Sequence, residues 1–221
     1  MWRYVVPNAL SCGNLAMGMV AMACALEENY FAAAVAILAG MVFDALDGNM
    51  ARLLHAGSEF GKQMDALCDL VTFGAAPAFL LYHQLLSHSD LSVAWLPILA
   101  FPCCGALRLA RFNTTVAPQG GGFCGMPITA AGGILAVCSL SIDWFGVMGI
   151  LLFTALLSFL MVSTIRYPDI KSVPFLKKPV GIAVALIAVL GCIWLFRDWL
   201  FVPLVAYACC GPLLMLITLK S

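Results

Sequence analysis

Residues 43–70 read FDALDGNMARLLHAGSEFGKQMDALCDL and place four aspartates within a chain that is otherwise strongly apolar. Asp44 and Asp47 stand three residues apart, and Asp65 and Asp69 stand four apart. Because a helix turns about 100° per residue, each pair falls on one face of its own helix. The sequence therefore predicts two helices that are joined by a short connection and that each have one acidic face.

These aspartates predict a site for divalent cations. A carboxylate within a bilayer is costly and normally faces a partner or a water-filled cavity. Four of them on adjacent helices repel one another unless cations neutralise them, and oxygen ligands without His or Cys favour a hard ion such as Mg²⁺ or Mn²⁺. Two facing pairs can hold two ions. The alternative is that some of the acids form ion pairs with Arg52, Lys62 or Arg108.

Two small residues share the acidic face of the first of these helices. Gly48 lies about 40° from Asp44 around the helix axis, and Ala51 lies almost directly below Asp44. Small side chains beside the acids let a substrate approach the backbone, and they also allow close helix packing in membranes. The sequence leaves both roles open.

The composition is that of an integral membrane protein. Of the 221 residues, 63% are hydrophobic and 10% are charged, and the mean hydropathy is +1.03. Soluble globular proteins are far more polar. We expect the first apolar run to be a retained span, because no cleavage-site pattern follows a short apolar core. Most of the ten cysteines lie within apolar runs, which predicts buried thiols rather than disulfides.

The apolar runs predict an all-α fold, a polytopic membrane helix bundle in one domain covering residues 1–221. About 20 apolar residues are needed for each crossing, which gives eight spans. The predicted spans are residues 9–26, 30–54, 58–86, 92–112, 126–142, 144–165, 179–196 and 199–219. Glycine, proline and charged residues mark the breaks between them.

Lys and Arg are divided unevenly between the two sides of this arrangement. Of the 11 basic residues, only Arg197 falls on the second side. Since cytoplasmic loops carry the excess of Lys and Arg, both termini are predicted to be cytoplasmic. Asp44 then lies about 21 Å from the external end of its helix, at about 1.5 Å per residue. The acidic site is therefore expected near the cytoplasmic leaflet and facing the cytoplasm.

The spacing of the acidic stretch matches a known motif, D-x2-D-G-x2-A-R-x8-G-x3-D-x3-D. All eight positions are met, at Asp44, Asp47, Gly48, Ala51, Arg52, Gly61, Asp65 and Asp69. With this motif the chain resembles the CDP-alcohol phosphotransferase family. The resemblance implies an integral membrane enzyme of the cell membrane that displaces CMP from a CDP-linked lipid with an alcohol.

The same resemblance implies roles for single residues. It makes the four aspartates metal ligands, and it makes Asp69 the general base as well. The residues that it implies for binding the CDP-lipid are Asn8, Asp47, Gly48, Ala51, Arg52 and Gly61. It also implies a homodimer, and no nucleic-acid partner is expected. Asn8 has a second interpretation, in which Pro7 opens the first helix and Asn8 or Ser11 caps it.

Three further motifs resemble the phosphatidylserine synthase branch of the family. They are F-G-x-x-P at residues 73–77, R-L-A-R-F-N at residues 108–113 and G-M-P at residues 125–127. The resemblance implies CDP-diacylglycerol and L-serine as substrates. Arg108 and Arg111, with Asn113 beside them, can present two guanidinium groups to a phosphate or to the serine carboxylate. The alternative is that these arginines serve positive-inside topology and contact lipid headgroups.

Other functions and sites remain open at this stage. A synthase of the same fold that uses glycerol 3-phosphate or an inositol phosphate needs additional cations near the site, and few are present. A divalent-ion transporter needs polar groups continuing across the bilayer, whereas the external halves of these helices are nearly all apolar. The glycine-rich loop, residues 113–125, is either a flexible linker or a mobile cover that orders on serine binding. The three histidines are interpreted as interface or loop residues.

Overall fold

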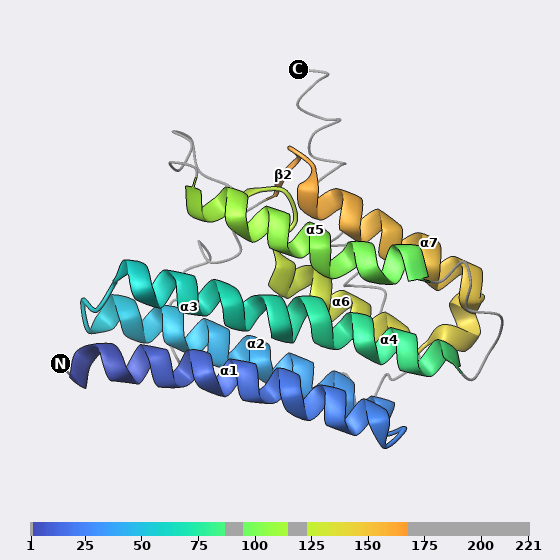
Figure 1. Cartoon of the computed structure of the whole chain (residues 1–221), viewed down its shortest axis with the longest axis horizontal. Coiled ribbons are helices and arrows are strands. Elements are labelled where there is room, and N and C mark those ends of the chain that lie inside the picture. The colour runs from blue at the N-terminus through green and yellow to red at the C-terminus, as the bar shows by residue number, and fades with distance from the viewer. Residues whose placement is uncertain (1, 87–94, 115–122, 168–221) are drawn as a thin grey trace.

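The structure, a computed structural model, describes residues 2–86, 95–114 and 123–167, and its regular elements there are helices and one pair of two-residue strands (Figure 1). The first two helices are α1, Trp2–Leu26, and α2, Tyr30–Leu53. A long third helix consists of α3, Glu59–Asp69, the π-helical turn η1, Leu70–Ala75, and α4, Ala76–Leu86. The remaining helices are α5, Trp95–Thr114, α6, Ile128–Ser139, and α7, Ile142–Val162.

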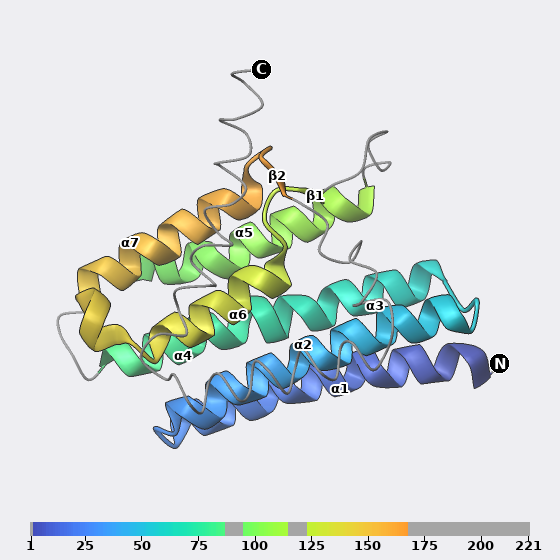
Figure 2. The ribbon, with the colours of Figure 1, turned by 180° about the vertical axis from the view of Figure 1, so that it is seen from behind.

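The helices form two layers with α6 between them (Figures 1 and 2). In one layer α1 packs along α2, and the continuous α3–η1–α4 helix lies beside them. In the other layer α5 packs along α7. The buried α6 contacts α2 and α4 and joins the two layers.

Small side chains line the contact between α1 and α2. Ala21 and Ala25 of α1 and Ala33 and Ala34 of α2 are fully or almost fully buried. Small residues let helix backbones approach closely, which gains dispersion energy where no hydrophobic effect acts between helices in lipid. This close approach brings the amino-terminal half of α1 against the acidic face of α2.

Four helices in the described part of the chain are long and apolar enough to cross a membrane, and the protein is a membrane protein. They are Trp2–Leu26, Tyr30–Leu53, Glu59–Leu86 and Trp95–Thr114. They correspond to the predicted spans 9–26, 30–54, 58–86 and 92–112, with ends that differ by a few residues except at the first helix.

Two of the other four predicted spans differ in length or shape from the helices observed there, and two lie outside the described residues. The predicted span 126–142 is a helix of 12 residues, about 18 Å long, which is shorter than the ~30 Å hydrocarbon core. Nearly all of its residues are buried within the bundle, which explains their apolar character. The predicted span 144–165 bends at Gly146, where φ is 65°. The predicted spans 179–196 and 199–219 lie outside the described residues.

The interpretation of Pro7 and its neighbours as a helix start is wrong. The first helix begins at Trp2 and continues through Pro7 without a break. Ser11 does not cap it, because its hydroxyl donates back to the Pro7 carbonyl at 3.2 Å and also reaches another helix. Asn8 is therefore a residue within α1 and not a helix cap.

The turn between α2 and α3 fixes the relative position of the two acidic helices. His55 adopts a left-handed conformation, with φ of 49°, and ends the α2 helix. Ser58 then caps α3, its hydroxyl accepting a hydrogen bond from the Gly61 amide at 3.0 Å. A side-chain cap of this kind stabilises a helix start by roughly 1 kcal/mol.

A pair of short strands connects the segment that precedes α6 with the segment that follows α7. The strands β1, Phe123–Cys124, and β2, Arg166–Tyr167, pair antiparallel there. Gly125 follows with φ of 81°, and a methyl group at this position would lie 2.4 Å from the Met161 carbonyl oxygen. The G-M-P motif noted in the sequence thus has a structural role, since only glycine fits at its first position.

Candidate active site

Three of the four aspartates form one cluster. The carboxylates of Asp44, Asp47 and Asp65 offer ligand oxygens that all lie within 4.8 Å of one another, and the three side chains are buried or partly buried. Asp44 and Asp47 come from the last three turns of α2, and Asp65 comes from the second turn of α3. The structure therefore brings the two acidic helix faces together, as the spacing predicts.

This cluster suits a hard divalent cation. Its donor atoms are carboxylate oxygens only, which Mg²⁺ and Mn²⁺ prefer and which zinc sites rarely use alone. Three like charges at this separation repel strongly in a medium of low dielectric constant unless a cation lies among them. The observed convergence is therefore the arrangement that a bound cation stabilises.

Asp69 lies beside the cluster and has its own partner. It is the last residue of α3, it is 7% exposed, and Asp44, Asp65 and Asp47 all lie within electrostatic reach of it. The side-chain amide of Asn14 donates a hydrogen bond to Asp69 Oδ1 at 2.9 Å. A π-helical turn follows Asp69 directly, and such turns are frequent at functional sites.

The α1 helix supplies two polar residues that the sequence analysis did not assign to the site. Ser11 donates a hydrogen bond to Asp47 Oδ2 at 2.7 Å, and Asn14 contacts Asp69. Both are buried, and both lie on the face of α1 that packs against α2 and α3. Their spacing of three residues in an otherwise apolar helix was the available signal, because it places both on one helix face.

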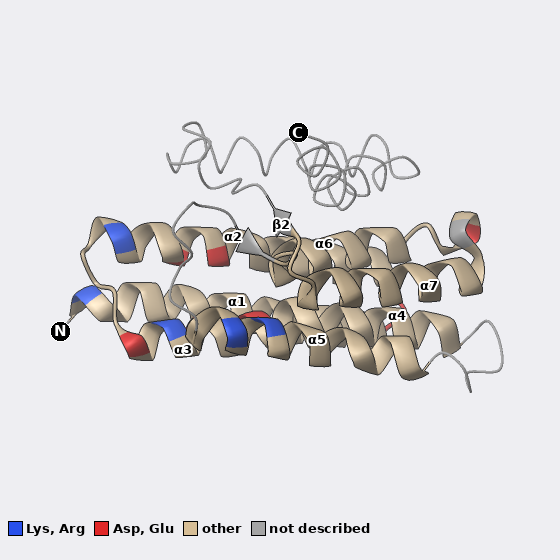
Figure 3. Cartoon of the chain, turned by 90° about the horizontal axis from the view of Figure 1, so that it is seen from above, with Lys and Arg blue, Asp and Glu red and all other residues tan. Residues whose placement is uncertain are grey.

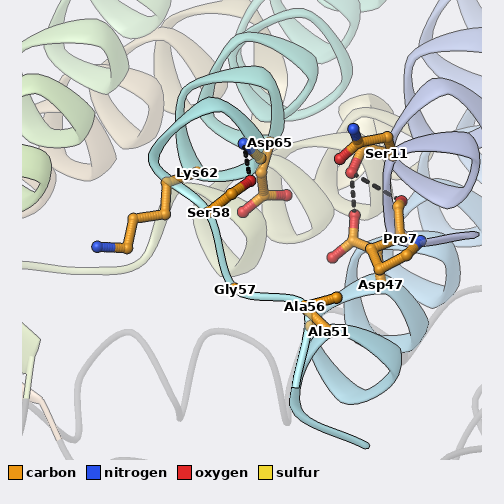
Figure 4. Close-up of a pocket in the computed structure, with 12 residues that line it drawn as sticks. Pro7, Ser11, Asp47, Ala51, Ala56, Gly57, Ser58, Lys62 and Asp65 are labelled. Carbon is orange, nitrogen blue, oxygen red and sulfur yellow. Dashed lines mark hydrogen bonds between the residues drawn. The ribbon is translucent and has the colours of Figure 1, made fainter. Parts of the chain in front are cut away.

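A pocket of about 180 Å³ opens between α1, α2 and α3 (Figure 4). Asp47 and Asp65 reach into it from different helices, Ser11 lies beside Asp47, and Lys62 points away from the acids. Lys62 forms an ion pair with Glu59 at 2.8 Å. The residues that line the pocket are Pro7, Asn8, Ser11, Asp47, Gly48, Ala51, Ala56, Gly57, Ser58, Gly61, Lys62 and Asp65.

The pocket gathers five of the six residues expected to bind the CDP-lipid. Asn8, Asp47, Gly48, Ala51 and Gly61 all line it. The sixth, Arg52, is exposed and does not line the pocket; its guanidinium donates to the side chain of Asn49 one turn earlier.

Gly48 is not a packing residue. A methyl group built at Gly48 meets no atom within 4 Å, so the missing side chain leaves open space in the pocket. Helix packing, one of the two roles that the sequence left open, thus does not explain this glycine. Gly61 is more enclosed, because a methyl group there would lie 3.2 Å from Ser58 Oγ and 3.5 Å from Asn8 Oδ1.

The two arginines of α5 have different surroundings. Arg108 is buried, and its guanidinium carbon lies 5.6 Å from the centroid of the Phe112 ring. Arg111 donates to the carbonyls of Val162 at 2.8 Å and Ser163 at 3.1 Å, at the end of α7.

Asn113, expected beside the arginines, lies near the end of α5. Its side-chain amide makes a long hydrogen bond of 3.5 Å to Gln63 of α3. The last helical turns of α5 therefore contact α3, the helix that carries Asp65 and Asp69. Most of the glycine-rich loop, residues 113–125, lies outside the described residues.

Comparison with known proteins agrees with this geometry. The profile of the CDP-alcohol phosphatidyltransferase family matches residues 4–165. The chain belongs to this family. The match includes all four aspartates, the pocket and both arginines of α5, and it ends before the last two predicted helices.

Three relatives of this chain share the name CDP-diacylglycerol-serine O-phosphatidyltransferase. The protein from Bacillus subtilis (strain 168) is 36% identical over 166 residues, which cover 75% of this chain and 91% of that protein. The one from Helicobacter pylori (strain 26695) is 33% identical over 177 residues, covering 77% and 74%. The one from Mycobacterium leprae is 30% identical over 222 residues, covering 94% and 73%.

Proposed function

We propose that this CDP-alcohol phosphatidyltransferase transfers the phosphatidyl group of CDP-diacylglycerol to the hydroxyl of L-serine, releasing CMP and forming phosphatidylserine. The observation that carries the proposal is the convergence of Asp44, Asp47 and Asp65 beside a pocket lined by the other motif residues. The shared name of the relatives supports serine as the acceptor. Neither a phosphorylated alcohol nor ion transport has comparable support.

In this reaction the serine hydroxyl oxygen bonds to the phosphorus that carries the diacylglycerol. The bond from that phosphorus to the bridging oxygen of the diphosphate breaks, and CMP leaves with the bridging oxygen. Asp69 takes the hydroxyl proton, since it is a buried carboxylate next to the acid cluster. The protein thus contributes mainly positioning and proton transfer.

A divalent cation completes the site in this proposal. Asp44, Asp47 and Asp65 would hold it, with Asp69 as a further ligand for a second ion, and Mg²⁺ or Mn²⁺ suits these oxygens. Such ions supply neutralisation of the diphosphate charge. Ser11 keeps Asp47 oriented by its hydrogen bond, whatever ion is bound.

The substrates approach from two directions in this proposal. The CDP group occupies the pocket, where the backbone of Gly48 is open to it and Asn8 offers a side-chain amide. Arg108, with Asn113 nearby in sequence, binds the serine carboxylate or the lipid phosphate. The guanidinium of Arg111 is engaged with α7, so we assign this arginine a mainly structural part.

We further propose a multi-pass protein of the cytoplasmic membrane with eight spans, both termini in the cytoplasm and the site facing it. In Figure 3 the Lys and Arg residues of the described chain gather in the half of the bundle that holds the α1 amino terminus and the α2–α3 turn. That distribution supports the orientation through the positive-inside rule. A homodimer is proposed from the family resemblance.

Purified protein tests the substrate assignment directly. CMP release is measured from CDP-diacylglycerol with Mn²⁺ or Mg²⁺ and one acceptor at a time: serine, glycerol 3-phosphate or inositol phosphate. The proposal predicts release with serine at least about tenfold faster than with the phosphorylated alcohols, since few cations near the site are available for a second phosphate. Faster release with either phosphorylated alcohol overturns the choice of serine.

A further inference from the structure

Asn14 makes an unusual contact for a helix inside a membrane bundle. Its side chain is fully buried, and its amide nitrogen donates to Asp69 Oδ1 at 2.9 Å. The direction of this hydrogen bond follows from chemistry, because an amide nitrogen can only donate. Hydrogen bonds to charged acceptors are about twice as strong as neutral ones, so Asn14 restrains the Asp69 side chain firmly.

Other groups pack closely around Asn14. The hydroxyl of Thr72 in η1 donates a hydrogen bond to the backbone carbonyl oxygen of Asn14 at 2.9 Å. Gly40 of α2 leaves room for both residues, since a methyl group there would lie 2.5 Å from Thr72 Cγ2 and 2.9 Å from Asn14 Oδ1. Gly18 similarly admits Thr72 against α1. Asn14 is thus confined among α1, α2 and η1.

Stability alone does not explain an asparagine at this position. Its Oδ1 is buried and accepts no hydrogen bond from any group in the described part of the chain. Leaving such an acceptor unsatisfied costs about 1–3 kcal/mol, and an apolar side chain would avoid that cost. What an apolar residue cannot do is donate to Asp69.

We propose that Asn14 is a positioning residue for Asp69. It occupies Oδ1 of the carboxylate and so leaves Oδ2 as the atom that takes the proton of the acceptor hydroxyl. Asn14 touches neither substrate in this proposal and acts through Asp69. The inference rests on the proposed function, because it assigns a positioning residue to the general base of that reaction.

The test compares Asn14→Ala with Thr72→Ala in the purified full chain. Each variant removes one hydrogen bond between α1 and the α3–η1 segment, but only Asn14→Ala frees Asp69. For Asn14→Ala we expect kcat to fall about 10- to 100-fold, while the KM values for CDP-diacylglycerol and serine stay within about threefold. For Thr72→Ala we expect kcat within about threefold of wild type.

Mn²⁺ binding without substrates gives a readout besides activity. Asp44, Asp47 and Asp65 would hold the first ion, and the hydrogen bond of Asn14 goes to Asp69, so Asn14→Ala is expected to keep the Kd of the tighter Mn²⁺ site within about threefold of wild type. A parallel loss of kcat and of Mn²⁺ affinity at that tighter site would mean that the site as a whole has collapsed. That result overturns a specific role toward Asp69.

The remaining outcomes are also decisive. If Asn14→Ala does not fold, Asn14→Leu restores side-chain volume without a donor and replaces it in the test; failure of both to fold assigns Asn14 to folding alone and overturns the inference. A wild-type kcat in the Asn14 variant used, Asn14→Ala or Asn14→Leu, also overturns it. Equal losses of kcat in the Asn14 and Thr72 variants do the same. If the wild-type protein shows no serine-dependent CMP release, the proposed function itself fails, and the inference fails with it.

Discussion

The hydroxyl of Ser11 donates a 2.7 Å hydrogen bond to Oδ2 of Asp47 across 36 residues of sequence. Three residues further along α1, Asn14 donates to Asp69. One helix therefore contacts one acid from each acidic pair through neutral side chains. Neutral donors orient the carboxylates without removing the negative charge that a cation requires, which arginine or lysine at these positions would do.

Ser11→Ala is expected to reduce kcat/KM for CDP-diacylglycerol about tenfold, because a hydrogen bond to a charged acceptor contributes about 1.5–3 kcal/mol and Asp47 loses its orientation. The control is Ser139→Ala. Ser139 is also buried, and its hydroxyl donates to the Ala136 carbonyl of its own helix. Steady-state kinetics of the two variants check the prediction, and equal effects would contradict it.

Gly48→Ala is expected to leave thermal stability unchanged or slightly raised, since the methyl group meets no atom within 4 Å and alanine favours the helix. The same methyl group intrudes on the pocket, so the KM for CDP-diacylglycerol should rise about tenfold. Gly132→Ala is the contrasting variant, because its methyl group would lie 2.4 Å from the Phe73 carbonyl oxygen and should lower the melting temperature. An unaltered KM in Gly48→Ala would remove this glycine from the binding site.

Arg111→Lys is expected to destabilise the protein by about 1–2 kcal/mol, because one ammonium group cannot reproduce the two hydrogen bonds to Val162 and Ser163. Thermal unfolding in detergent measures this loss. A wild-type melting temperature combined with a raised serine KM would return Arg111 to the serine site.

Arg108→Lys separates three roles of that arginine. If Arg108 holds the serine carboxylate, the KM for serine should rise more than the KM for CDP-diacylglycerol, because the planar fork is lost and the charge is kept. A rise confined to the CDP-diacylglycerol KM indicates a lipid phosphate as its ligand. Wild-type values for both indicate topology alone, since Lys and Arg count alike there.

Asp44→Ala and Asp65→Ala are each expected to abolish CMP release and to weaken Mn²⁺ binding at least about tenfold, because each removes one of three clustered ligands. Titration with Mn²⁺ measures the affinity, and Asp143→Ala, which removes an exposed acid of α7, serves as the control. Chelation with EDTA should stop the wild-type enzyme, and added Mn²⁺ should restore it. An unchanged Mn²⁺ titration in both cluster variants would mean that these acids are structural.

The acidic site was the most predictable part of this molecule. Helical spacing alone places Asp44 with Asp47 and Asp65 with Asp69, and the cost of charge in a membrane requires that the pairs face a common partner. The spacing could not show that Asp69 would have a neutral partner of its own. That contact depends on how closely α1 approaches α3 and η1, which is set by tertiary packing at Gly18 and Gly40.

The fold was less fully predictable. Hydropathy identifies apolar runs but does not fix where a helix begins and ends, and so the predicted span 126–142 is longer than the 12-residue α6. The helix start predicted at Pro7 was wrong, because Pro7 lies in the second turn of a helix that begins at Trp2, where its missing N–H affects only the carbonyl of the exposed Arg3. The two hydrogen bonds from Arg111 to α7 could not be predicted, because their carbonyl partners lie about 50 residues away in sequence.

The central claim is that serine attacks CDP-diacylglycerol with Asp69 as the base, and simultaneous measurement of CMP and phosphatidylserine in wild type and Asp69→Asn tests it most directly. The account predicts equal amounts of the two products from the wild type, formed only when serine is present. It predicts a folded Asp69→Asn protein whose turnover is lower by at least about 100-fold, because the amide cannot take the proton. CMP release without serine, or turnover of Asp69→Asn within a few-fold of wild type, would contradict it.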